Sequence, residues 1–181
     1  MGNRKQAIQK AREYKAVRPV FLDTETTGLD QSAEIIEICI VDYDDAVLLD
    51  TLVRPSGKIP LDAVQIHGIT NEMVKGAPTW LEVWPSVQAI LQGKYIGIYN
   101  VEFDQRMLRQ TNQIYSIAWE YPSLRFFDVM KLYADYSGAQ RFASLEAAGR
   151  QCGIAIPNSH RARDDTRLLR ALFNFIASRL P

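Results

Sequence analysis

The sequence is poor in cysteine and histidine, and it contains no long hydrophobic run. Its 181 residues include two histidines and two cysteines, Cys39 and Cys152, which lie far apart and form no CxxC pair. This spacing excludes a disulfide framework and a Cys/His zinc site. No apolar run approaches the ~20 residues of a membrane span, and the start MGNRKQAIQK lacks the apolar core of a secretory signal. We therefore expect a cytoplasmic protein without a membrane segment.

The formal net charge is zero, with 21 basic and 21 acidic residues, which is unusual for a protein that grips long duplex DNA through many phosphate contacts. The charge is unevenly placed, because residues 1–18 carry six basic residues and one acidic residue. We predict a basic helical extension over residues 1–18 and one domain over residues 19–181. Solvation or nucleic-acid contact explains the basic face of the extension. The acidic excess of the domain is either a solvated surface or a group of carboxylates that converges on cations.

Hydrophobic periodicity predicts three strands in a row, followed by helices that alternate with two more strands. The second and third strands meet near Asp44 and Asp45 as an antiparallel hairpin, and residues 55–78 form a loop with short helical turns. This order predicts an α/β fold with a mixed five-stranded sheet flanked by helices, in which sites form at the carboxyl ends of the parallel strands. The predicted strands are 20–25, 34–42, 46–53, 95–99 and 125–127, and the predicted helices are 3–17, 79–92, 102–112, 128–136, 144–152 and 162–178.

Two acids occupy one face of the first predicted strand. Side chains alternate along a strand, so Phe21, Asp23 and Glu25 in the run VFLDTE share a face. Two carboxylates on an otherwise apolar face repel each other and lose hydration. A divalent cation between them removes both costs, and oxygen ligands suit Mg²⁺ or Mn²⁺. The alternative is a strand end that reaches solvent.

Asn100 and Asp104 frame the start of the helix predicted over residues 102–112. Asn100 is placed to cap this helix, and Asp104 lies in its first turn, where the helix dipole favours an anion. Asp104 also shares a helical face with Met107 and Leu108, which turns it towards the core. Asp104 is therefore either a surface acid that stabilises the dipole or a buried acid that needs a partner.

The last predicted helix places an aspartate in line with its buried stripe. Asp165 lies three residues before Leu168 and four before Leu169, the first two residues of this stripe. Asp164 is rotated from Asp165 by about 100°, although it lies four residues before Leu168. An aspartate on a core-facing stripe needs a partner or an ion, so we favour Asp165 as a ligand. His160 precedes the helix, after the segment 157–159. It is either a surface or capping residue, or it lies over the same acids.

In their order and spacing, these segments resemble the DEDD exonuclease family, histidine branch (DEDDh). The DxE motif is Asp23-Thr24-Glu25, the NxxFD motif runs from Asn100 to Asp104, and the HxAxxD motif runs from His160 to Asp165. The loop 66–70 also resembles a segment of the proofreading epsilon subunit of bacterial DNA polymerase III, the best-known member. The resemblance covers residues 19–178. The sequence stops at Pro181 without the polymerase-binding tail of epsilon, which counts against a role as a polymerase subunit but not against the chemistry.

The resemblance implies a ribonuclease H-like fold and two-metal 3′→5′ hydrolysis of single-stranded ends, with DNA favoured, that releases nucleoside 5′-monophosphates. The carboxylates of Asp23, Glu25, Asp104 and Asp165 would hold two Mg²⁺ or Mn²⁺ ions, and they are the expected catalytic residues together with His160. His160 would act as the general base for the attacking water. The residues expected around the terminal nucleotide are Thr26, Thr27, Gly28, Leu29, Ile66, His67, Asn100 and Phe103.

Several alternatives stay open. One is an RNA-processing or oligoribonucleotide-degrading exonuclease, because no residue is identified as a reader of the 2′-hydroxyl. Another is a nucleic-acid-binding accessory module of a replication or repair complex, although the complete acid set counts against it. For His67, a structural role in its turn is an equal alternative to nucleotide binding. The expected partners are single-stranded DNA or RNA 3′ ends and replication or repair proteins, and the oligomeric state is left open.

Overall fold

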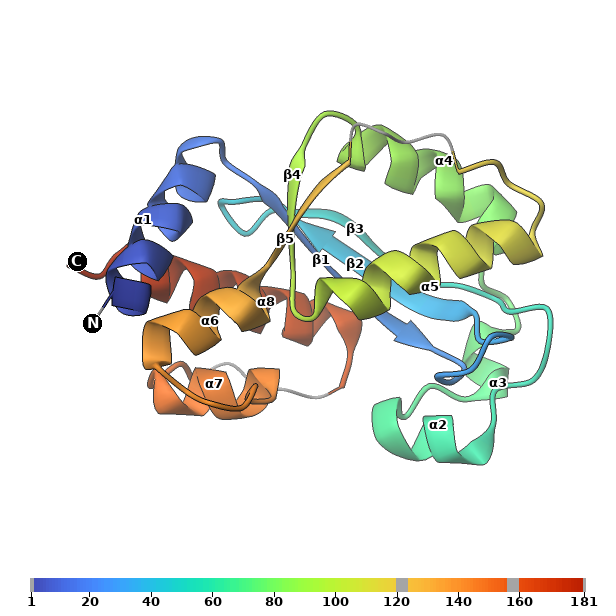
Figure 1. The fold of residues 1–181 in the computed structure, drawn as a ribbon. Coiled ribbons are helices and arrows are strands. Elements are labelled where there is room, and N and C mark those ends of the chain that lie inside the picture. Colours follow the sequence, from blue (N-terminus) through green and yellow to red (C-terminus); the bar gives the residue numbers. More distant parts are fainter. Residues whose placement is uncertain (1, 120–123, 156–159, 181) are drawn as a thin grey trace.

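A five-stranded mixed sheet forms the centre of the protein in the computed structural model, which describes residues 2–119, 124–155 and 160–180 (Figure 1). The strands are β1 (Val20–Thr26), β2 (Ile35–Val41), β3 (Val47–Leu52), β4 (Tyr95–Ile98) and β5 (Arg125–Asp128). Their order is β3-β2-β1-β4-β5. β1 pairs antiparallel with β2 and parallel with β4, while β2–β3 is antiparallel and β4–β5 is parallel. The predicted sheet, antiparallel on one side and parallel on the other, is confirmed.

Helices cover both faces of this sheet (Figure 1). One face carries α1 (Gly2–Ala16), α6 (Val129–Ser137), α7 (Leu145–Gln151) and α8 (Ala162–Ala177), and the other carries α4 (Trp80–Leu91) and α5 (Val101–Ile114). The short helices α2 (Leu61–His67) and α3 (Asn71–Val74) fall in the segment where the sequence predicts helical turns. No helix in the described ranges has both the length and the apolar character required to cross a membrane.

The two faces of β1 have different partners because its side chains alternate. Phe21 belongs to the hydrophobic cluster shared with α1, α6 and α8, whereas Leu22 belongs to the cluster shared with α4 and α5. Asp23 and Glu25 follow Phe21 in alternation, so they lie on the face that α8 covers. The stripe predicted for α8 is confirmed, because its apolar members are at most 1% exposed: Leu168, Leu169, Leu172, Phe173 and Ile176.

Helix α1 packs into the same cluster as α6 and α8. Its residues Ala7, Ile8 and Ala11 are at most 1% exposed. Arg12 also reaches the carboxyl-terminal end of the chain, where its Nη2 donates a 2.7 Å hydrogen bond to the carbonyl of Arg179. The structure therefore ties α1 closely to the rest of the protein, and a domain boundary at residue 18 stays a prediction.

Gly97 lies where β4 passes two aromatic rings. A Cβ added at this position would lie 2.7 Å from Cδ1 of Phe21 and 2.8 Å from Cζ of Phe127. We expect Gly97→Ala to lower the free energy of unfolding by about 1–3 kcal/mol, because the rings must leave their packed positions. Urea denaturation measures this loss. The control is Gly76→Ala, whose added Cβ meets no atom within 4 Å, and equal stability of the two variants would contradict the close packing.

Candidate active site

Three acids from β1 and α8 meet at one end of the sheet. Asp23, Glu25 and Asp165 each offer a carboxylate oxygen, and these oxygens all lie within 4.8 Å of one another. We call these three residues the carboxylate cluster. Asp165 is 7% exposed in the first turn of α8, whereas Asp164 is half-buried, so the predicted orientation of Asp165 is confirmed. The structure thus brings together three of the four acids that the sequence proposes as metal ligands.

The fourth acid, Asp104, approaches the cluster from α5. It is 3% exposed, and its Oδ1 accepts a 2.7 Å hydrogen bond from Oγ1 of Thr24, the residue between Asp23 and Glu25. The charge of Asp104 raises the pKa of Asp23, which means that the two carboxylates are close. Of the two alternatives for Asp104, the structure therefore supports the buried acid.

The pKa values of these carboxyl groups are raised, chiefly by burial. The pKa of Asp23 lies well above its usual range because of burial and then because of the charges of Asp104, Glu25 and Asp165. Burial and the charge of Asp165 raise the pKa of Glu25 to about 8. Burial raises the pKa of Asp104 to about 7, although the hydrogen bond from Thr24 acts in the opposite direction. Such groups take up either protons or cations, and their all-oxygen donor set fits Mg²⁺ or Mn²⁺.

Glu37 is a further buried acid beside the cluster, and the sequence analysis missed it. It is 3% exposed on β2, opposite Glu25 in the strand pairing. Its Oε1 accepts from Nη2 of Arg161 at 2.5 Å, and its Oε2 accepts from the backbone N–H of Ala162 at 2.9 Å. Glu37 therefore anchors the start of α8, which carries Asp165. A signal was present, because Glu37 interrupts the apolar run IIEICIV.

A cavity of about 430 Å³ opens next to Glu25, between the loop that follows β1 and the helix α2. We call it the β1–α2 cavity. Its volume is in the usual range for small-molecule sites. Two large apolar side chains on its wall are exposed, Leu29 by 75% and Ile66 by 62%. Seven of the eight residues expected around the terminal nucleotide line this cavity: Thr26, Thr27, Gly28, Leu29, Ile66, His67 and Phe103.

Asn100, the eighth, departs from the expectation. It occupies the N-cap position of α5, but its backbone is left-handed (φ 69°) and its side chain makes no capping hydrogen bond. Capping residues typically have an extended backbone at this position, and Asn100 makes no such bond, so the predicted cap is wrong. Oδ2 of Asp128 instead accepts from the backbone N–H of Val101 at 3.3 Å. Among the described residues, Asn100 is also absent from the lining of the β1–α2 cavity.

The two histidines have different environments. His67 is 4% exposed, and its Nδ1 accepts a 3.0 Å hydrogen bond from the backbone N–H of Ile69, so it also supports its turn. Burial lowers the pKa of His67, and the charges of Arg161 and His160 act in the same direction. His160 is exposed and directly precedes Arg161, the N-cap residue of α8. The segment 157–159, which was expected to carry it over the acids, lies outside the described residues.

The raised pKa values predict how stability depends on pH. We expect the metal-free protein to lose stability as the pH rises from about 4 to about 8, because the folded state then holds protons on Asp23, Glu25 and Asp104 that the unfolded state has released. Mg²⁺ offsets the same charges. At a hundredfold excess over its Kd, Mg²⁺ adds about 2.7 kcal/mol to the free energy of unfolding, which raises Tm by roughly 5–10 °C.

Thermal unfolding at pH 5.5 and pH 8.0, with and without Mg²⁺, measures this effect. The increase in Tm caused by Mg²⁺ should be larger at pH 8.0, where protons compete less for the carboxylates. Glu25→Gln should reduce that increase. An increase that is the same at both pH values would contradict a link between these carboxylates and the cation.

Comparisons with known proteins identify related exonucleases. The sequence model of the RNase_T exonuclease family matches residues 20–173. A protein of Escherichia phage 186, named uncharacterized exonuclease CP81, is 34% identical over 180 residues, which cover 93% of each chain. The structure of exonuclease X in complex with 5′ overhanging duplex DNA matches with a TM-score of 0.66 at 28% identity, over 86% of this chain and 89% of that chain. The nuclease domain of 3′hExo, a DEDDh family member bound to rAMP, matches in fold with a TM-score of 0.72 at 16% identity, over 84% of this chain and 88% of that chain.

Longer relatives are matched over part of their length. The chain is 36% identical to the PolC-type DNA polymerase III of Thermotoga petrophila over 85% of its own length, but it spans 11% of that protein. It spans 72% of the DNA polymerase III epsilon subunit of Treponema pallidum, at 31% identity. The solved structures confirm the expected ribonuclease H-like fold. The chain therefore belongs to the RNase_T family of exonucleases, and its motifs resemble those of the DEDDh group.

Proposed function

We propose that the chain is a divalent-metal-dependent 3′→5′ exonuclease that removes nucleoside 5′-monophosphates from single-stranded DNA ends. One observation carries this proposal. Carboxylate oxygens of Asp23, Glu25 and Asp165 lie within 4.8 Å of one another, beside a cavity large enough for a nucleotide. Glu25 belongs to both, so a nucleotide in the cavity has its phosphate next to the carboxylates. A strand end enters such a site more easily than the middle of a duplex.

The acids of the site are suited to metal-assisted phosphodiester hydrolysis. Asp23, Glu25 and Asp165 would hold one ion and Asp104 would help to hold a second, in the all-oxygen setting that Mg²⁺ or Mn²⁺ prefers. Two such ions, when bound, stabilise the attacking and leaving oxygens of a phosphodiester. Thr24 keeps Asp104 oriented through its 2.7 Å hydrogen bond. These acids are deprotonated while their carboxylates bind cations.

Proton transfer falls to His160. It is exposed directly before Arg161, the N-cap residue of α8, and it precedes Asp165 by five residues in sequence. Histidine suits proton transfer near neutral pH. We propose that its imidazole takes a proton from the attacking water.

The β1–α2 cavity would bind the terminal nucleotide. Exposed apolar side chains beside a cavity favour a ligand that covers them, and Leu29 and Ile66 are exposed by 75% and 62%. Phe103 adds an aromatic ring to the same wall, on which a base can stack. The buried His67 also lines the cavity, and it supports its own turn by accepting a hydrogen bond from the backbone N–H of Ile69.

The choice of DNA rests on a relative. Exonuclease X, at 28% identity, was solved with 5′ overhanging duplex DNA. We further propose a cytoplasmic location, since Cys39 and Cys152 are free in the structure as in a reducing compartment. Replication or repair proteins are the proposed protein partners, by analogy with the epsilon relatives.

Product analysis on matched DNA and RNA strands of about 20 nucleotides tests the proposal. With Mg²⁺ or Mn²⁺, a 3′-labelled DNA strand should release a labelled mononucleotide at once, while a 5′-labelled strand should shorten in a ladder. The reverse order of release would overturn the direction. Faster cleavage of RNA would favour an RNA-processing enzyme, and binding without any release of mononucleotide would favour an accessory module.

A further inference from the structure

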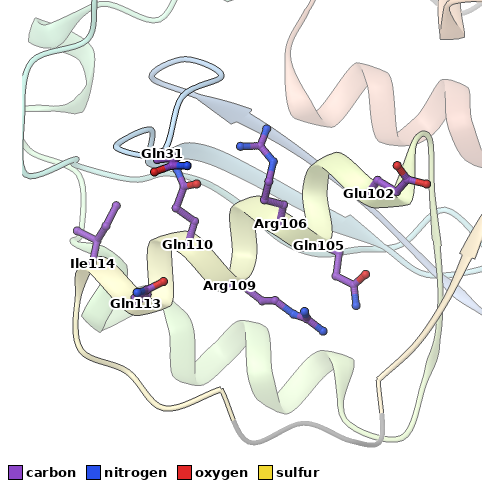
Figure 2. Close-up of a pocket in the computed structure, with 8 residues that line it drawn as sticks. All are labelled: Gln31, Glu102, Gln105, Arg106, Arg109, Gln110, Gln113 and Ile114. Atoms are coloured by element: carbon purple, nitrogen blue, oxygen red, sulfur yellow. The ribbon is translucent and has the colours of Figure 1, made fainter.

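The exposed side of α5 forms a groove outside the β1–α2 cavity. This α5 groove has a volume of about 590 Å³, and its lining includes four glutamines and two arginines, Arg106 and Arg109 (Figure 2). Figure 2 shows Arg106 and Gln110 pointing towards the segment that carries Gln31, while Arg109 points away from it. Arginine and glutamine side chains supply many hydrogen-bond donors, which suits a ligand rich in acceptor oxygens.

Arg106 joins this groove to the β1–α2 cavity. Its Nη1 donates a 3.2 Å hydrogen bond to the carbonyl of Leu29, and its guanidinium lies 5.4 Å from the centre of the Phe103 ring. Leu29 and Phe103 both line the cavity. Gln110 holds the same loop from α5, because its Nε2 donates to the carbonyl of Ala33 at 2.6 Å. The loop after β1 is therefore a wall common to the cavity and the groove.

The charge of the groove is positive. Its lining contains one acid, Glu102, and this carboxylate is bound by Nζ of Lys131 at 3.0 Å. Within the described ranges, neither Arg106 nor Arg109 pairs with a carboxylate. The guanidinium of Arg109 lies 5.5 Å from the centre of the Trp119 ring, which holds the arginine in place without neutralising it.

A second hollow extends the groove along the same helix. It is lined by Arg109, Gln113 and Trp119, among others, so it shares two side chains with the α5 groove. Arg109 follows Asp104 by five residues and Gln113 follows it by nine, which corresponds to roughly 7–8 Å and 13–14 Å along the helix axis. The donors thus run away from Asp104 in one direction along α5.

We propose that the α5 groove binds the phosphodiester backbone of the single-stranded DNA that leads to the nucleotide in the β1–α2 cavity. This inference rests on the proposed function and adds a second subsite to it. Arg106 and Arg109 contact phosphates, and the glutamine amides donate to phosphate and sugar oxygens. Contacts of this kind position a strand without reading its sequence. Long strands are therefore bound more tightly than dinucleotides.

Arg109→Gln tests the subsite, because Arg109 touches neither the carboxylate cluster nor the β1–α2 cavity. Loss of one single-strand phosphate contact lowers the salt slope, d log K/d log[salt], by about 0.7 in magnitude. The same relation gives a loss in affinity of about eightfold at 50 mM salt and about threefold at 200 mM salt. We expect these losses in kcat/KM for a DNA strand of about 20 nucleotides, and less than a twofold change for a dinucleotide.

Two matched variants complete the experiment. Arg150→Gln removes an equal charge from α7, on the other face of the sheet, and should leave the salt slope unchanged. Gln113→Lys adds a charge to the groove and should steepen the slope. An unchanged slope and unchanged kcat/KM in Arg109→Gln would overturn the subsite while the wild-type enzyme still releases mononucleotides. If the wild type releases none from either substrate, it is the proposed function that fails.

Discussion

Asp23→Asn is expected to abolish nuclease activity while it stabilises the metal-free protein. Asp23 is the member of the carboxylate cluster whose pKa is raised by the charges of Asp104, Glu25 and Asp165, after burial itself. Asparagine keeps the size of the side chain and removes the charge, so the repulsion among the buried acids falls. The same substitution removes an oxygen ligand of full negative charge from the site. Because loss of an outer-shell partner of a metal ligand already costs about 10–100-fold, we expect more than about 10²-fold here.

Two measurements separate the effect of the substitution on catalysis from its effect on folding. Steady-state cleavage of labelled single-stranded DNA gives the loss in kcat/KM, and thermal unfolding without metal gives the change in Tm. Asp164→Asn is the matched control, because Asp164 neighbours Asp165 on α8 but lies outside the carboxylate cluster. It should retain activity within a few-fold. Wild-type activity in Asp23→Asn would remove Asp23 from the catalytic site, and a fall in Tm would show that its charge supports the fold.

Local periodicity is sufficient to predict much of this site. Alternation along a strand places Asp23 and Glu25 on the face of Phe21, and the structure has all three on the side that α8 covers. Helical spacing favours Asp165 over Asp164, because Asp165 lies three residues before Leu168 and four before Leu169. These predictions need no knowledge of distant contacts. They depend on geometry that holds within one strand or one turn.

The parts that the sequence does not reveal depend on contacts between distant segments. Glu37 and Arg161 are 124 positions apart, and only the packing of α8 on β2 brings them together. The failed cap at Asn100 has the same origin, since Asp128 from β5 takes over a free N–H group of α5. The α5 groove could not be predicted from the sequence for another reason. Arginine and glutamine are common on the solvent side of a helix. Here they line a groove because the loop after β1 packs beside them.

His160→Ala is expected to slow cleavage by about 10²–10⁴-fold, the usual contribution of a general base. A base must be unprotonated to accept a proton, so wild-type activity should rise from acidic towards mildly alkaline pH. At saturating Mg²⁺, where protons no longer compete for the carboxylates, the variant should lose this rise. Because His160 is exposed and lies outside the carboxylate cluster, the Tm and its increase with Mg²⁺ should both be unchanged. Rate measurements across pH 5.5–9.0, combined with thermal unfolding, test the three expectations together.

His67→Ala supplies the contrast, because it removes the other histidine of the chain. His67 is 4% exposed and accepts a hydrogen bond from the backbone N–H of Ile69, so its loss leaves a buried donor unsatisfied at a cost of about 1–3 kcal/mol. This variant should lower Tm and raise KM, and it should keep the pH dependence of the wild type. If His160→Ala instead lost the Mg²⁺-dependent increase in Tm, His160 would be a metal ligand. If its pH profile kept the wild-type rise at saturating Mg²⁺, the proton from water would pass to a different group.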